Sequence, residues 1–207
     1  MPVFLGCDIT RFSEMYMPRV LIVYGTTDGH TEKVAFRLGE MFRANDVQAE
    51  VYHAVAVPDE VDPAYFDGVV VAASVHARGY QGSIRRWVRR HRTELASRPS
   101  AFLSVCLGVL QQDPAAQWEV RRIIENFLNG TGWKPTVVKP VAGALPWTRY
   151  GWLKRWVMQR IVARQGGDVD THRNFEYTDW DDLATFVQTF ALRIGARPFV
   201  PEATPMT

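Results

Sequence analysis

The chain has 207 residues, of which 47% are hydrophobic and 22% charged, with a formal net charge of +2, so we expect one globular domain with a well-buried core. Its two cysteines, Cys7 and Cys106, are too few for a disulfide scaffold and favour a reducing cytoplasm. No apolar run is long enough to span a bilayer, which leaves a soluble or membrane-surface protein.

Residues 1–18 precede the first clear strand and show no regular period. Asp8, Arg11 and Glu14 interrupt any apolar core, and no basic segment stands at the start, so we expect no signal peptide. We treat this stretch as an N-terminal extension without an assigned function.

The first strong pattern is a strand, a short loop and a helix. Val20–Tyr24 is an apolar run typical of a strand buried on both faces of a parallel sheet, and Gly25–His30 is a polar loop. Such a junction offers backbone N–H groups and the positive end of a helix dipole to an anion such as phosphate. The pattern equally allows Thr31 or Asp28 merely to cap the helix. The helix that follows should bury one face, formed by Val34, Ala35, Leu38 and Phe42.

The composition of this loop narrows the choice of anion. It lacks the lysine of a Walker A loop and the glycine pattern of a dinucleotide site, which disfavours a nucleoside triphosphate or NAD. It instead resembles the flavodoxin phosphate loop, with Thr26, Gly29, Thr31, Ala35 and Leu38 at that family's spacing. The resemblance implies that hydroxyls and amides of this loop hold the phosphate of FMN. The residues implied are Thr26, Thr27, Asp28, Gly29, His30 and Thr31.

Strands and helices alternate along the rest of the chain. Further strands are predicted over 47–53, 68–73, 101–107 and 136–142, and further helices over 83–95, 115–128 and 179–194. This alternation is typical of a parallel, doubly wound sheet, in which ligands bind at the carboxyl ends of the strands. Pro140 marks the 136–142 strand as an edge or irregular strand.

The loop after the 68–73 strand is the second candidate for the site. In flavodoxin-like proteins this loop borders the flavin ring, which implies contacts from Ser74, Val75 and His76. The ring of Tyr80 could lie against a flat ligand. His76 and Arg78 are equally consistent with surface residues. The helix that follows is rich in arginine, and its charged face is either solvated or attracted to an anionic surface or substrate.

The third candidate loop begins at the end of the 101–107 strand. Simple flavodoxins often place an aromatic residue here, and this chain has none from Gly108 to Pro114. Backbone contacts to the flavin ring are therefore expected, from Cys106, Leu107 and Gly108. We interpret the thiol of Cys106 as a small buried hydrophobic group rather than a redox centre.

A basic, aromatic insert occupies about residues 143–172. Five basic side chains and no acidic one fall between Arg149 and Arg164. Helical spacing would place on one face Tyr150, Leu153, Trp156 or Val157, and Ile161. This amphipathic pattern is typical of an interfacial membrane helix. It is also consistent with a helix docked on its own sheet with a solvated basic face.

Several motifs in the same order resemble the bacterial flavodoxin-like protoporphyrinogen oxidases, also called menaquinone-dependent protoporphyrinogen IX dehydrogenases. Besides the phosphate loop, the motifs are Pro99–Val105, Ala142–Leu145, Arg149–Trp152, Gly166–Thr171 and Tyr177–Trp180. The resemblance runs from about residue 19 to 194. It implies a flavodoxin-like fold, with a five-stranded parallel sheet of order 2-1-3-4-5 and the insert near strand 5. It also implies FMN-dependent oxidation of protoporphyrinogen IX, with electrons passed to a membrane quinone.

The chemistry expected of each part follows from this resemblance. A side chain cannot accept a hydride, so the flavin carries the reaction and no catalytic residue is assigned. The insert should meet the substrate propionates or anionic lipid. The partners implied are protoporphyrinogen IX, menaquinone and the inner face of the membrane, with a homodimer as one possible assembly and with no metal or nucleic acid. The insert residues expected to make contact are Trp147, Arg149, Tyr150, Trp152, Lys154, Arg155 and Trp156.

Other functions stay open at this point, among them another FMN-dependent quinone reductase. A soluble FMN electron carrier is disfavoured by the positive net charge and the basic insert, since such flavodoxins are commonly acidic. An interaction domain without a cofactor is disfavoured by the intact phosphate loop. In domain terms we expect an N-terminal extension (1–18), a single flavodoxin-like domain (19–196) and a loose tail (197–207).

Overall fold

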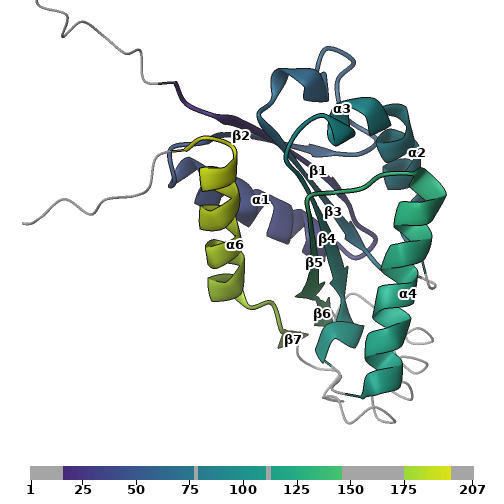
Figure 1. Ribbon diagram of the computed structural model, residues 1–207. Helices are drawn as coiled ribbons and strands as arrows, with labels where there is room; N and C mark the ends of the chain where they lie inside the picture. The colour runs from purple at the N-terminus through teal and green to yellow at the C-terminus, as the bar shows by residue number, and fades with distance from the viewer. Residues whose placement is uncertain (1–15, 77–78, 111–112, 146–174, 197–207) are drawn as a thin grey trace, which may run out of the picture.

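The computed structural model describes residues 16–76, 79–110, 113–145 and 175–196. At its centre is a five-stranded parallel sheet of order β2-β1-β3-β4-β5 (Figure 1), which confirms the predicted topology. The strands run side by side in register, with Val20 opposite both Ala49 and Gly68. Their bounds are β1 Arg19–Gly25, β2 Gln48–His53, β3 Gly68–Ser74, β4 Ser100–Cys106 and β5 Val137–Ala142.

The three central strands are buried on both faces, as their apolar runs predict. Residues 20–25 of β1, 68–73 of β3 and 100–105 of β4 are all buried. The two outer strands are only partly buried, and Val138 of β5 is 40% exposed. Pro140 lies in β5, which is an edge strand as expected, because proline cannot donate to a central ladder.

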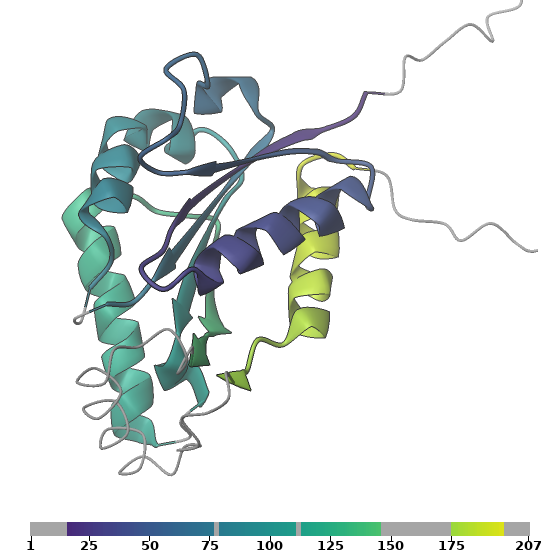
Figure 2. The same cartoon turned by 180° about the vertical axis from the view of Figure 1, so that it is seen from behind.

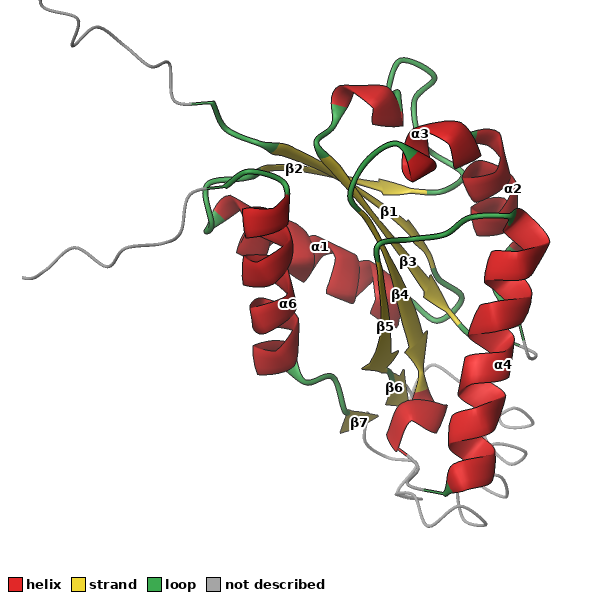
Figure 3. Cartoon of the chain, viewed as in Figure 1, coloured by secondary structure: helices red, strands yellow, loops and turns green. Residues whose placement is uncertain are grey.

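Helices cover both faces of the sheet (Figures 2 and 3). On one face, α1 (His30–Arg43) and α6 (Trp180–Arg193) pack together, with Phe42 of α1 against Phe190 of α6. The other face carries α2 (Gly82–Arg90), α3 (Arg92–Ala96) and α4 (Pro114–Thr131). Each layer has its own hydrophobic core, so the sheet is sandwiched between two apolar layers.

Two details differ from the sequence prediction. The single helix expected over 83–95 is divided at His91, whose backbone (φ −104°, ψ 24°) is outside the helical region, and the break leaves both Trp87 and Leu95 buried in the same core. A small antiparallel pair was not expected: β6 (Ala144–Leu145) pairs with β7 (Phe175–Glu176). Short 3₁₀ turns also occur, η1 (Pro63–Tyr65) and η2 (Leu107–Leu110).

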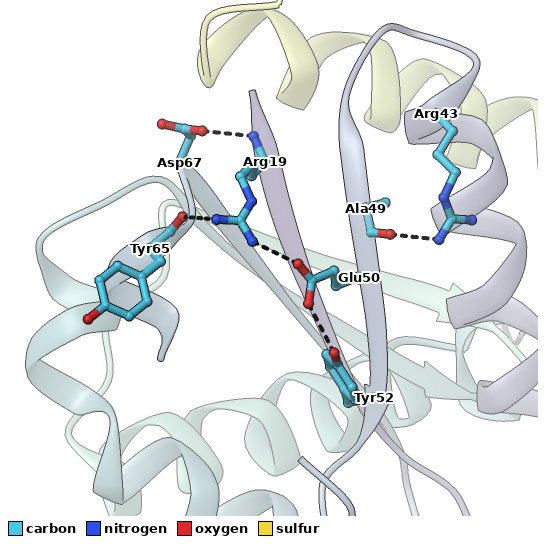
Figure 4. Close-up of polar contacts among 7 residues, drawn as sticks. All are labelled: Arg19, Arg43, Ala49, Glu50, Tyr52, Tyr65 and Asp67. Atoms are coloured by element: carbon cyan, nitrogen blue, oxygen red, sulfur yellow. Dashed lines mark hydrogen bonds and ion pairs between the residues drawn. The ribbon is translucent and has the colours of Figure 1, made fainter. Parts of the chain in front are cut away.

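The amino edge of the sheet is held by side-chain contacts (Figure 4). The guanidinium of Arg19 donates to Glu50 at 2.8 Å and to the carbonyl of Tyr65 at 3.3 Å, and the Arg19 backbone N–H donates to Asp67 at 2.7 Å. The hydroxyl of Tyr52 donates to the same Glu50 carboxylate. These contacts join β1, β2 and the segment before β3. The side chains of Arg19, Glu50, Tyr52 and Asp67 therefore all have hydrogen-bond partners within the protein.

Within the described residues, no helix combines the length and apolar character needed to cross a bilayer.

Candidate functional site

The candidate site lies where β1, β3 and β4 end. These strands are neighbours and parallel, so the loops after Gly25, Ser74 and Cys106 leave the sheet at the same edge. The structure therefore brings together the three loops that the sequence singled out, at the edge where doubly wound sheets bind ligands.

Helix α1 begins at this edge without a side-chain cap. Its N-cap residue is Gly29, in the left-handed region (φ 87°, ψ −10°), which glycine adopts without strain. Two other described helices show the contrast, because Asp113 caps α4 and Asp179 caps α6 through their carboxylates. The first amides of α1 have no partner within their own helix, so the positive end of its dipole is available to an anion.

Thr31, in the first turn of α1, carries the clearest sign of a missing partner. The residue is fully buried, and its Oγ1 has no hydrogen-bond partner among the described atoms. An unsatisfied buried hydroxyl is costly and rare in folded proteins. Thr31 therefore does not cap its helix, and the interpretation of Thr31 as a simple cap is wrong.

The loop itself is held by its own side chains. The Oγ1 atom of Thr26 accepts a hydrogen bond from the N–H of Gly29 at 2.9 Å, which closes the turn. Gly25 must stay small, because a Cβ there would lie 2.5 Å from Cγ1 of Ile84 in α2. The end of β1 thus packs directly on α2.

The titratable side chains around the start of α1 already have partners within the protein. Tyr24 donates its hydroxyl proton to Glu32 at 2.8 Å, and burial together with that carboxylate raises the pKa of Tyr24 to about 12. His30 is half-buried, and burial lowers its pKa, so it is neutral at pH 7. Its Nε2 lies 2.7 Å from Oγ1 of Thr178, which belongs to the segment before α6.

Gln81 joins the first loop to the second and was not singled out from the sequence. Its Nε2 donates to Oγ1 of Thr27 at 3.1 Å and to Oγ of Ser74 at 2.8 Å. Its Oε1 is buried without a partner. The only sequence signal was its place in the second loop, next to the start of α2.

The second loop differs from the expectation at Tyr80. Its side chain is 7% exposed, its hydroxyl is 2.7 Å from Oγ of Ser104, and its ring meets Phe102 and Phe127 edge-on. Tyr80 therefore packs in the core rather than presenting a free face. Burial accordingly raises its pKa. His76, by contrast, is exposed, and its backbone pairs with that of Gly79.

The third loop offers mainly backbone groups to the candidate site. Cys106 is a free, partly exposed thiol whose pKa is raised by burial, so it stays protonated at neutral pH, as expected of a small hydrophobic group. Leu107 and Gly108 lie in the turn η2, and a Cβ on Gly108 would lie 2.8 Å from Val120 of α4. Val75, in the neighbouring loop, donates its N–H to the carbonyl of Val105.

Comparisons with known proteins show the family and the fold of this chain. A flavodoxin-domain family model matches residues 21–172. A protein of Escherichia coli K12 named protoporphyrinogen IX dehydrogenase [quinone] is 32% identical over 173 residues, 84% of this chain and 94% of that protein. A Leishmania major protein of the same name is 30% identical over 192 residues, 90% of this chain and 80% of the relative.

The chain belongs to the flavodoxin-domain family, together with these dehydrogenases.

Solved structures show the same flavodoxin fold. Oxidised Flavodoxin 1 from Bacillus cereus superposes with a TM-score of 0.51 at 14% identity, over 84% of this chain and 97% of that one. At that identity the likeness concerns the fold alone.

Part of the site that the sequence predicts lies outside the described residues. All the insert residues predicted to contact substrate or membrane fall between 146 and 174, and Arg78 also falls outside. Two hollows of about 220 and 260 Å³ open on the described surface, one between residues 54–61 and α2 and the other between β5 and α6. Neither is lined by a residue of the first loop, and the case for an anion site rests instead on the start of α1.

Proposed function

We propose that this protein is an FMN-dependent dehydrogenase that oxidises protoporphyrinogen IX to protoporphyrin IX and passes the electrons to a quinone. The proposal is supported by the two relatives named protoporphyrinogen IX dehydrogenase [quinone], which align with most of this chain. The order of motifs from the phosphate loop to Tyr177–Trp180 supports the same activity.

The observation that carries the cofactor assignment is the orphaned hydroxyl of Thr31 beneath an uncapped helix start. A phosphate would accept from that hydroxyl and from the first amides of α1, and it would complement the helix dipole. In the proposed site, the loop from Thr26 to Thr31 holds the phosphate of FMN. The described residues therefore fit the cofactor.

Bound FMN supplies the redox chemistry, because no side chain can accept a hydride. The chain's own groups position it. Gln81 ties Thr27 to Ser74, so the phosphate loop and the second loop keep a fixed separation. In our proposal, Val75 and His76 border the flavin on one side. The backbone from Cys106 to Gly108 borders it on the other, and Cys106 contributes no thiolate.

We propose that the basic, aromatic insert contacts the substrate or the membrane. Its tryptophans and basic residues would offer apolar faces and charge partners to the porphyrinogen propionates or to anionic lipid. We propose menaquinone as the acceptor, with peripheral attachment at the inner face of the cell membrane, and a homodimer as one possible assembly. The residues assigned to substrate or membrane contact are Trp147, Arg149, Tyr150, Trp152, Lys154, Arg155 and Trp156.

The activity is tested anaerobically, by adding protoporphyrinogen to protein loaded with FMN and following porphyrin fluorescence with and without menaquinone in liposomes. We expect fluorescence to rise above the uncatalysed rate only with flavin and quinone both present. Tightly held FMN without porphyrin formation would contradict the dehydrogenase and leave a flavodoxin-type electron carrier. Colourless protein that does not take up FMN would contradict the cofactor assignment as well.

A further inference from the structure

The first turn of α1 is tied to a segment that lies far away in sequence. His30 contacts Thr178 at 2.7 Å, and Lys33 forms an ion pair with Glu176 at 2.5 Å. The two helix residues are three apart and share one helix face, while the two partners are two apart and share one side of an extended segment. The contacts therefore lie side by side.

The direction of the His30 hydrogen bond follows from the protons available. The hydroxyl of Thr178 donates its single proton to the carbonyl of Ala142 at 2.8 Å, since a carbonyl can only accept. Oγ1 of Thr178 must then accept from Nε2–H of His30. Neutral His30 consequently carries its proton on Nε2, and that proton is directed toward Thr178.

These bonds form one chain from the phosphate loop to the far side of the sheet. It runs from the first residue of α1 through Thr178 to Ala142 at the end of β5, which stands three positions from β1 in the strand order. Thr178 is 8% exposed, so solvent does not readily replace it as a partner. The neighbouring backbone is fixed as well, because the N–H of Tyr177 donates to the carbonyl of Gly143 at 3.2 Å.

The ion pair between Lys33 and Glu176 and the hydrogen bond between His30 and Thr178 should contribute differently to stability. The side chains of Lys33 and Glu176 are 53% and 33% exposed, and ion pairs at such positions contribute little because water screens them. The His30 bond is half-buried, and a buried donor that loses its acceptor carries a full desolvation penalty. The hydrogen bond between His30 and Thr178 is therefore the less exposed of the two contacts and the one whose loss should cost more.

We propose that His30 and Thr178 are positioning residues, whose side chains aim the first amides of α1 and the hydroxyl of Thr31 at the cofactor phosphate and do not themselves touch the cofactor. This inference rests on the proposed function. It revises the expectation for His30, whose Nε2–H is committed to Thr178 rather than to the phosphate.

The test compares the affinities of the cofactor-free protein for FMN and riboflavin, which differ only in the phosphate. Thr178→Val keeps the shape of the side chain but removes the hydroxyl that accepts from His30. We expect FMN to bind roughly tenfold more weakly, with the affinity for riboflavin unchanged. Thr178→Ser restores a hydroxyl and should restore FMN affinity. Lys33→Met serves as the control, because it removes the exposed ion pair with Glu176 and the contact with the Trp180 ring but leaves the bond between His30 and Thr178 in place. It should change FMN binding less than twofold.

His30→Leu gives an independent route, because it removes the donor while leaving Thr178 in place. It should lower FMN affinity by a similar factor, and combining it with Thr178→Val should add little further loss, since both remove the same bond. Variants that weaken FMN and riboflavin equally, or additive losses in the double variant, would overturn the positioning role. Wild-type protein that binds FMN no better than riboflavin would contradict the phosphate site itself, and this inference with it.

Discussion

At the scale of single residues, Thr31 is unusual because its hydroxyl is buried without a partner in the cofactor-free chain. Such a group destabilises the fold unless a ligand satisfies it. Thr31→Val should therefore leave the cofactor-free protein as stable as wild type, or more stable by up to ~1 kcal/mol. Thermal unfolding without flavin measures this, with Thr31→Ser as the control. A clear loss of stability in the valine variant would mean that the hydroxyl is satisfied within the protein.

His30 gives a prediction for pH at the same scale. Burial lowers its folded-state pKa, so the unfolded chain binds a proton more readily than the folded chain. Stability should be constant above the ordinary histidine pKa of about 6.5 and should fall as the pH drops from there to the lower folded pKa. His91 shifts in the same direction, also through burial, and contributes in the same window.

Urea unfolding at several pH values between about 5 and 8 checks this dependence on both histidines. His30→Gln should flatten the profile on the acid side, His91→Gln should flatten it as well, and the double variant should be the flattest. Profiles that all keep the wild-type slope would show that neither histidine has a lowered pKa.

At the scale of elements, the start of α6 depends on its cap. Asp179 accepts from the N–H groups of both Asp181 and Asp182, at 3.1 and 2.9 Å. Asp179→Ala should lower the free energy of unfolding by about 1 kcal/mol. Asp181→Ala removes an acidic group from the same turn but no cap bond, and should cost less. Equal losses in urea unfolding would contradict the capping role.

The elements also show what the sequence could and could not predict. Apolar runs located β1, β3 and β4, because a strand buried on both faces has little choice of residue. The pair β6 and β7 was missed, because strands of two residues have no periodicity to detect. The division at His91 was also missed, since the burial spacing continues across it.

For the site, sequence reasoning found the three loops but not the bonds between them. The loops follow from strand ends and glycine-bearing stretches, which are local signals. Gln81 reaches Thr27 across 54 residues, and Thr178 reaches His30 across 148, so neither contact leaves a pattern in the sequence. Tyr80 was expected beside a flat ligand, yet an aromatic residue after a strand can equally turn into the core, as it does here.

At the scale of the whole molecule, the proposed membrane attachment depends on where the basic residues lie. Replacing Lys154, Arg155 and Arg160 by Glu should weaken binding to anionic liposomes steeply, since each basic group near such a surface contributes about 1 kcal/mol. Co-sedimentation measures the binding. The matched control makes the same change of charge at three exposed basic residues on separate elements, Arg121, Lys134 and Arg193. Equal losses in both triple variants would indicate that net charge, rather than the insert, governs the attachment.

The central claim is that catalysis depends on FMN held by its phosphate beneath the start of α1. The most direct measurement is the anaerobic rate of porphyrin formation as a function of FMN concentration, for wild type, Thr31→Val and Thr31→Ser. A hydrogen bond to a charged group contributes about 1.5–3 kcal/mol, so the valine variant should need at least ~10-fold more FMN for half-maximal rate, with the maximal rate retained. Thr31→Ser should behave as wild type. An unchanged FMN requirement in Thr31→Val, or porphyrin formation without any flavin, would contradict the account.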